Sequence, residues 1–100
     1  MYYVYLLLSE KDKGFYIGYT TDIEARIKRH NDGEVVSTKH RRPLKLIYYE
    51  AYVTEKDAKG REIFLKSGGG RRFLKKQLTH TYQELALENE IEIDEATPAS

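Results

Sequence analysis

Three short hydrophobic runs, at residues 2–8, 15–20 and 44–53, dominate the pattern of the chain. The first run is aromatic and aliphatic without a polar break, which is typical of a strand buried on both faces. The second and third runs are rich in aromatic and β-branched residues, which suit a pleated, half-buried surface. A polar stretch ending in Gly14 separates the first two runs. We therefore predict three strands, of which the first two form a hairpin.

Helical spacing of apolar residues follows the second and third runs. Thr21 or Asp22 can cap the first helix, and Gly33 can close it in the left-handed conformation. Thr54 can cap the second helix. The three glycines at 68–70 are interpreted as a break before the third helix. The first predicted helix begins at residue 23 and ends near residues 31–33, and the other two span about 55–67 and 71–87. The order β-β-α-β-α-α predicts an α/β fold.

Two of the predicted helices carry polar side chains on their apolar faces. In the first helix, Ile23, Arg26, Ile27 and His30 follow the spacing i, i+3, i+4, i+7, so an arginine and a histidine share the isoleucine face. Glu62 lies in a similar position in the second helix. A charge withdrawn from water needs a partner. We therefore expect an anionic group near Arg26, and an ion pair with Glu62 is the structural alternative.

The charge of the chain is unevenly distributed. The formal net charge is +1, but residues 1–83 hold all 17 basic residues and 10 of the 16 acidic ones, a net charge of +7. A basic body of this size attracts phosphate, although a solvated surface is the simpler reading. We predict one domain over residues 1–88 and an acidic, disordered tail over residues 89–100.

Composition excludes several classes of protein. The chain has no cysteine, so disulfides and thiolate metal sites are ruled out. It has no apolar run of membrane-spanning length and no signal peptide, so we expect a cytoplasmic protein without a membrane partner. Lys39, Arg41 and Arg42 precede the third strand and are predicted to contact nucleic acid, with a solvated loop as the alternative.

The tyrosines on the first two predicted strands and the polar side chains on the two helices are together compatible with phosphodiester hydrolysis. That reaction needs a base for the attacking water, positive charge at the phosphate and often a metal on a carboxylate. Tyrosine, arginine and glutamate can fill these roles, but many small domains contain the same residue types. The structural alternatives are core tyrosines with satisfied hydroxyls and a histidine that only complements the dipole at the end of its helix.

The order and spacing of several positions resemble the GIY-YIG nuclease superfamily. The positions are the triplets at 3–5 and 16–18, followed by Arg26, His30 and Glu62. The chain is most similar to small single-domain bacterial members that resemble the N-terminal endonuclease domain of the bacterial excinuclease. The resemblance covers roughly residues 1–80, and it departs from the family pattern at Tyr3, which stands where the first motif has glycine.

This resemblance implies a three-stranded antiparallel sheet flanked by about three helices, and hydrolysis of DNA with Mg²⁺ or Mn²⁺. By the same resemblance, Tyr5 and Tyr16 are the motif tyrosines, with Tyr5 favoured as the base and Tyr16 assisting or positioning the phosphate. Arg26 would stabilise phosphoryl charge, and His30 would aid proton transfer or hold the tyrosine. Glu62 would bind the metal, since one carboxylate suits a magnesium ion that keeps most of its waters.

We therefore expect a metal-dependent endonuclease acting on DNA, including branched or single-stranded forms, in repair or recombination. Two alternatives stay open at this point. One is a nucleic-acid-binding module of the same fold with little or no activity. The other is a protein-interaction module whose acidic tail binds a basic partner or covers the basic face of the chain itself. The sequence leaves the oligomeric state open.

Overall fold

The computed structural model describes residues 1–89. It contains two compact units, Met1–Ile63 and the part of the chain from Phe64 onward, and each is described by itself below. All of the predicted acidic tail except Asn89 lies outside the described residues. The division into a domain at residues 1–88 and a tail stays a prediction. Within the described range, no helix is both long and apolar enough to cross a membrane.

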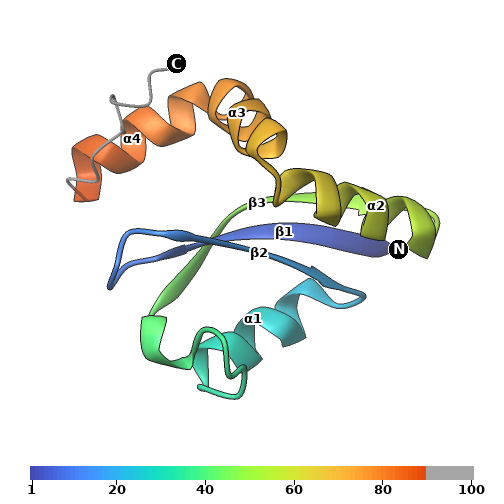
Figure 1. The fold of residues 1–100 in the computed structure, drawn as a ribbon. Helices are drawn as coiled ribbons and strands as arrows, with labels where there is room; N and C mark the ends of the chain where they lie inside the picture. The colour runs from blue at the N-terminus through green and yellow to red at the C-terminus, as the bar shows by residue number, and fades with distance from the viewer. Residues whose placement is uncertain (90–100) are drawn as a thin grey trace. The chain divides into compact units, whose positions relative to one another are not determined.

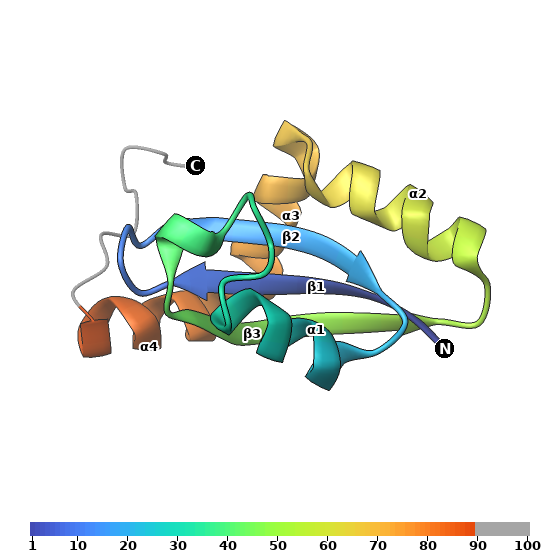
Figure 2. The same cartoon turned by 90° about the horizontal axis from the view of Figure 1, so that it is seen from below.

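The first unit is built on the three predicted strands (Figures 1 and 2). The sheet order is β2-β1-β3, and β1 pairs antiparallel with both neighbours, as predicted. The central strand is buried from Val4 to Leu8, in keeping with its unbroken apolar sequence. The strands are β1 (Tyr2–Ser9), β2 (Phe15–Thr20) and β3 (Leu44–Tyr52), and the helices that follow them are α1 (Ile23–Asn31), the short 3₁₀ helix η1 (Lys39–Arg41) and α2 (Glu55–Leu65).

One face of the sheet packs against α1. Tyr5 and Leu7 of β1 form a buried cluster with Leu44, and Ile23 and Ile27 of α1 pack against it. Alternation along β1 places Tyr5 and Leu7 on the same face, so the face that carries the motif tyrosine is the one that α1 covers.

The opposite face of the sheet is tied to α2 by a polar network. Glu50 of β3 pairs with Val4, which places it on the other side of the sheet from Tyr5. Its carboxylate accepts hydrogen bonds from the hydroxyls of Tyr48 and Tyr52 at 2.5 and 2.6 Å. Arg61 of α2 donates two more at 2.8 and 3.0 Å. The hydrogen bonds between Arg61 and the Glu50 carboxylate hold α2 on the sheet. Arg61 directly precedes Glu62 in the chain.

The helix caps follow the sequence. The Asp22 carboxylate accepts from the Ala25 amide at 3.1 Å, and Gly33 has φ of +81° just after α1. Thr54 Oγ1 accepts from the Asp57 amide at 3.3 Å at the start of α2. The predicted starts of both helices are therefore confirmed.

The second unit differs from the prediction in two respects. The predicted single helix over residues 71–87 is two helices, α3 (Gly68–Gln77) and α4 (Thr79–Asn89), so the described part of the chain has four α-helices. The glycines at 68–70 do not break the chain but form the first turn of α3. Ser67 caps this helix, because its Oγ accepts a hydrogen bond from the Gly70 amide at 3.1 Å. Gly70 is buried so close to the backbone of Phe64 and Leu65 that no side chain fits there.

Candidate active site

The site is centred on the hydroxyl of Tyr5, in the middle of β1. The Tyr5 residue is 1% exposed. Its hydroxyl accepts a hydrogen bond from Arg26 Nε at 3.3 Å and lies 2.8 Å from His30 Nε2. Both partners come from α1, because the helix packs on the Tyr5 face of the sheet. The spacing of Arg26 and His30 by four residues brings them to one side of the helix, as the sequence predicted.

The donor and the acceptor can be assigned for each hydrogen bond in the network around His30. A guanidinium only donates, so the single Tyr5 proton is free to point to His30 Nε2. His30 Nδ1 then donates to Thr38 Oγ1, 2.7 Å away, and the Thr38 hydroxyl donates to the Val35 carbonyl at 3.5 Å. We assign the Nδ1–H tautomer on this network. The chain of hydrogen bonds runs from Arg26 to a loop carbonyl.

Burial sets the protonation of the two central groups. Burial is the main reason that the pKa of His30 falls from 6.5 to about 4, and the charges of Arg26 and Arg29 add to this effect, so the imidazole is neutral at pH 7. Burial also raises the pKa of the Tyr5 phenol, against the lowering effect of the Arg26 hydrogen bond. The resting site therefore contains a protonated tyrosine, a neutral histidine and a charged arginine.

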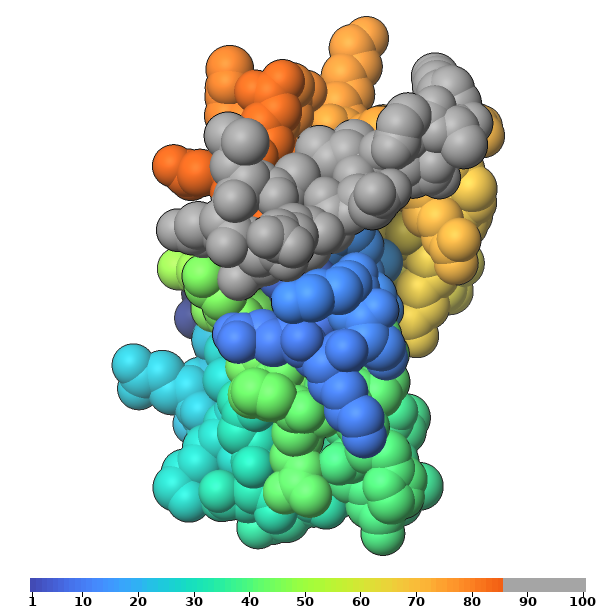
Figure 3. All heavy atoms as spheres, turned by 90° about the vertical axis from the view of Figure 1, so that its left-hand side faces the viewer, coloured from blue at the N-terminus to red at the C-terminus, as the bar shows by residue number. Residues whose placement is uncertain are grey.

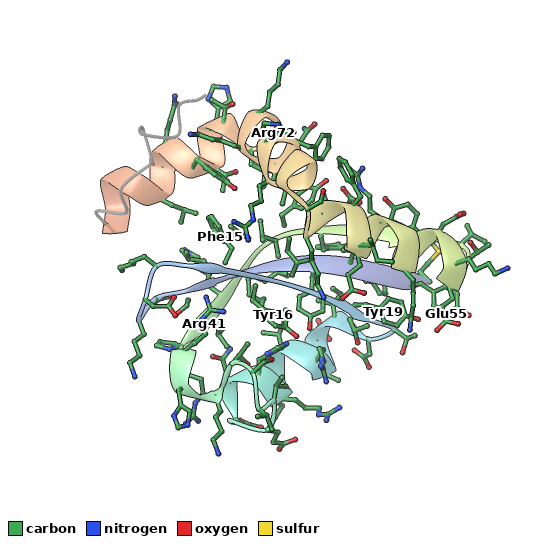
Figure 4. The ribbon with its side chains drawn as sticks, in the orientation of Figure 1. Phe15, Tyr16, Tyr19, Arg41, Glu55 and Arg72 are labelled. Carbon is green, nitrogen blue, oxygen red and sulfur yellow. The ribbon has the colours of Figure 1, made fainter. Side chains whose placement is uncertain are left out.

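Gly18 makes room for this arrangement. It pairs with Tyr5 across β1 and β2, and a Cβ at Gly18 would overlap the Tyr5 hydroxyl and ring. Tyr16, two residues earlier, lies between the sheet and α1 (Figure 4). Its ring centroid is 6.3 Å from that of Tyr5 and 5.1 Å from that of His30. Tyr16 is only half-buried, so of the two motif tyrosines it is the one that solvent reaches.

Arg26 is held by tyrosine hydroxyls rather than by a carboxylate. A hydrogen bond to Tyr5 is the main reason that the pKa of Arg26 is raised, and Tyr16 contributes a weaker one. Within residues 1–89, no carboxylate lies at ion-pairing distance from Arg26, so the alternative of an Arg26–Glu62 pair is not observed. The guanidinium keeps an unneutralised charge at the edge of the site.

Glu62 lies on α2 and is half-buried. Burial is the main cause of the raised pKa of Tyr5, and the negative charge of Glu62 adds to it, which places this carboxylate within electrostatic range of the site. Among the described residues, no three His, Cys, Asp or Glu side chains gather into a group that could hold a metal. The donors present suit a hydrated Mg²⁺ held by one carboxylate and by substrate oxygens, not a cage built by the protein alone.

The structure separates the three basic loop residues. Arg41 donates to both carboxylate oxygens of Asp12, at 2.7 and 3.2 Å, and joins η1 to the β1–β2 turn. The pKa of Asp12 falls to about 2, mainly because of this hydrogen bonding to Arg41 and also because the Gly14 amide donates to the carboxylate. Lys39 and Arg42 instead line an open pocket. Their nucleic-acid role stays a prediction, and the geometry gives Arg41 a structural task.

Sequence reasoning missed two residues of the site. Thr38, which is fully buried, fixes the His30 ring, and no spacing rule links it to the helix eight residues earlier. The role of Gly18 could have been inferred, because a glycine inside a strand often marks a close approach.

The chain is similar to a known domain family and to several known proteins. The family model of the GIY-YIG catalytic domain matches residues 1–77. The UPF0213 protein CPE1444 of Clostridium perfringens is 42% identical over 67 residues, which cover 66% of this chain and 71% of that protein. The UPF0213 protein YazA of Bacillus subtilis is 37% identical over 87 residues, which cover 86% of this chain and 78% of that protein. The solution structure of the UPF0213 protein BH0048 from Bacillus halodurans is 32% identical, covers 94% of this chain and 98% of that chain, and has a TM-score of 0.46.

GIY-YIG domains form a nuclease superfamily that acts on nucleic acid and generally depends on a divalent metal. The names of the UPF0213 relatives specify no reaction. The match extends over both motif tyrosines, α1 and α2, and so includes every residue of the site. This chain belongs to the GIY-YIG family.

Proposed function

We propose that the protein is a divalent-metal-dependent endonuclease that hydrolyses phosphodiester bonds in DNA, in a repair or recombination pathway. The observation that carries the proposal is the state of Arg26. Its charge is not neutralised by a carboxylate of the described chain, and it lies beside two tyrosine hydroxyls in a site that the field of Glu62 reaches. This combination suits a phosphate whose negative charge grows in the transition state.

Arg26 is the group proposed to stabilise that charge. Tyr5 binds its Nε and Tyr16 makes a weaker hydrogen bond, and together they hold the guanidinium in place. The remaining N–H groups can donate to phosphate oxygens. Fixed donors aimed at developing charge are worth more than mobile ones, because they need no reorganisation during the reaction. The Tyr5–His30 pair is then the support that orients Arg26.

The role of general base falls to Tyr16 rather than to Tyr5. A base must come within hydrogen-bond reach of the attacking water. Tyr5 is 1% exposed, and burial raises its pKa, whereas Tyr16 is half-buried on the same face. We therefore propose Tyr5 as a positioning residue and Tyr16 as the base, the reverse of the roles that the family resemblance favoured.

Glu62 is the residue proposed to hold Mg²⁺ or Mn²⁺. When bound, such an ion supplies Lewis-acid stabilisation of phosphate oxygens. The contribution of the chain itself is to fix Glu62 on α2, and the hydrogen bonds between Arg61 and Glu50 anchor that helix to the sheet.

The test is cleavage of labelled single-stranded, duplex and branched DNA with Mg²⁺ or Mn²⁺. Tyr16→Phe should lower the cleavage rate by at least about 100-fold, the lower range for losing a positioned acid–base group. Glu62→Gln should also abolish most cleavage, because it removes the proposed ligand of the metal. Tyr5→Phe should lower it less. Glu24→Gln, which removes an exposed carboxylate from α1, is the matched control and should leave cleavage unchanged.

The same experiment decides between enzyme and binding module. The protonated, buried Tyr5 is equally suited to a module that only holds a phosphate beside Arg26. If the parent binds DNA but cuts none of the substrates, the binding module is the better account. If it neither binds nor cuts at low salt, a protein-interaction role takes its place.

A further inference from the structure

An open pocket lies at the end of the first unit where the β1–β2 turn meets η1. Its volume is about 580 Å³, within the range of small-ligand sites. Figure 3 shows this end of the first unit, with the turn in blue and the segment around η1 in green. The pocket is lined by Lys11, Asn31, Lys39, His40, Arg42 and Pro43.

The lining is basic and contains no acid. Lys11, Lys39 and Arg42 contribute three permanent positive charges, and His40 adds an imidazole. Lys11 and Lys39 are exposed, and neither side chain has a hydrogen bond or ion pair within the described residues 1–89. Cations that share a concave surface without a counter-charge create an anion-attracting potential.

An ion pair and several hydrogen bonds hold the segments around the pocket in place. None of them involves the side chain of Lys11 or Lys39. Arg41 binds Asp12 and so joins η1 to the β1–β2 turn. The Asn31 side chain donates to the Leu44 carbonyl at 2.9 Å and accepts from its amide at 2.8 Å. Arg42 Nε donates to the Lys39 carbonyl at 2.8 Å, which fixes the position of its guanidinium. The pocket is thus pre-organised, and a ligand would not have to assemble it.

The pocket lies along α1 from the candidate active site. Asn31 ends the helix five residues after Arg26, a rise of about 7.5 Å at 1.5 Å per residue. Phosphates of one strand advance by about 3.4 Å along a duplex axis. A strand whose scissile phosphate lies at Arg26 would therefore bring phosphates two or more nucleotides away to the pocket.

We propose that this pocket binds backbone phosphates of the nucleic acid, flanking the phosphate held at Arg26. The inference rests on the proposed function, because it assumes that Arg26 holds the scissile phosphate. It extends that function by adding Lys11 and His40 to the binding surface and by removing Arg41 from it. Contacts of this kind are independent of base sequence and fix the strand in register with the active site.

The test is equilibrium binding of a fluorescein-labelled single-stranded DNA to the full chain, in EDTA, over a range of KCl concentrations. Lys11→Gln/Lys39→Gln should reduce the slope of log K against log salt by about 1.4, because each single-strand phosphate contact contributes about 0.7. This corresponds to about 25-fold weaker binding at 0.1 M salt if the curves meet at 1 M. Lys56→Gln/Lys76→Gln removes the same charge from exposed positions outside the pocket and is the control.

The outcomes separate this inference from the proposed function. A loss of slope in the pocket variant but not in the control supports the pocket, whether or not the parent cuts DNA. Equal slopes in the two double variants overturn it, even if the parent cuts and Glu62→Gln does not. A loss seen only with strands that carry a terminal phosphate also overturns it, because the pocket would then hold strand ends. Unchanged circular dichroism must accompany each result.

Discussion

The buried imidazole of His30 should make the stability of the protein depend on pH. Burial lowers its pKa from 6.5 to about 4, so between these values the unfolded chain binds a proton that the folded chain does not. The free energy of unfolding should therefore fall as the pH falls from 6.5 toward 4, and be flat with respect to this group below pH 4. For those two pKa values, the loss between pH 7 and pH 5 is about 2 kcal/mol.

The assay is urea unfolding at pH 7 and pH 5, followed by circular dichroism, for the parent and for His30→Gln. Glutamine can accept and donate hydrogen bonds at this position but does not titrate. The difference between the two pH values should be about 2 kcal/mol larger in the parent than in the variant. Other groups cancel in this comparison. Equal differences in the two proteins would refute the reasoning, as would an NMR titration in which all three histidines are protonated at pH 5.

Alanine substitution at either of two glycines should destabilise the protein, because the added Cβ would overlap neighbouring atoms. Gly18→Ala should displace Tyr5, lower the free energy of unfolding by about 1–3 kcal/mol, and reduce cleavage, as measured by urea unfolding and gel assay. Gly70→Ala should cost a similar amount because its Cβ would overlap the backbone of Leu65, but it should leave the Tyr5 network intact. Gly60→Ala in α2, which has no neighbour within 4 Å, should be neutral or stabilising by about 0.5–1 kcal/mol, so a loss there would contradict the steric argument.

The sheet and the first two helices could be predicted because local signals agree with the tertiary structure. The strands are unbroken apolar or aromatic runs, and the starts of α1 and α2 have side-chain caps at Asp22 and Thr54. In each case the residue types favour one conformation before any long-range contact forms. The family resemblance added the three-stranded antiparallel sheet, which the runs alone do not specify.

The second unit was predicted less well because its boundaries depend on weak signals. Three consecutive glycines usually interrupt a helix, yet here Ser67 caps them and Gly70 permits close packing on the backbone of Phe64 and Leu65. The interruption at Leu78 has no proline or glycine to mark it, although its backbone leaves helical geometry at φ of −107° and ψ of 34°. Such a break is not visible in residue type.

The structure brings Tyr5, Tyr16, Arg26 and His30 together, because their spacing follows helix and strand periodicity. Their catalytic roles stay predictions. The basic pocket, by contrast, could not be predicted from the sequence. Lys11 lies far from η1 along the chain and reaches it only through the β1–β2 turn, which sequence periodicity cannot reveal.

The Tyr5–His30 pair is neutral, and a neutral pair would suit the proposed phosphate site. A carboxylate in place of Tyr5 would hold Arg26 more strongly but would also cancel its charge. A charged imidazole at His30 would repel Arg26, which is one cause of the lowered pKa of that histidine. A phenol backed by a neutral imidazole instead fixes the guanidinium through a hydrogen bond and leaves its full charge for an anion. The cost of burying polar groups is offset because each has a partner, through to the carbonyl beyond Thr38.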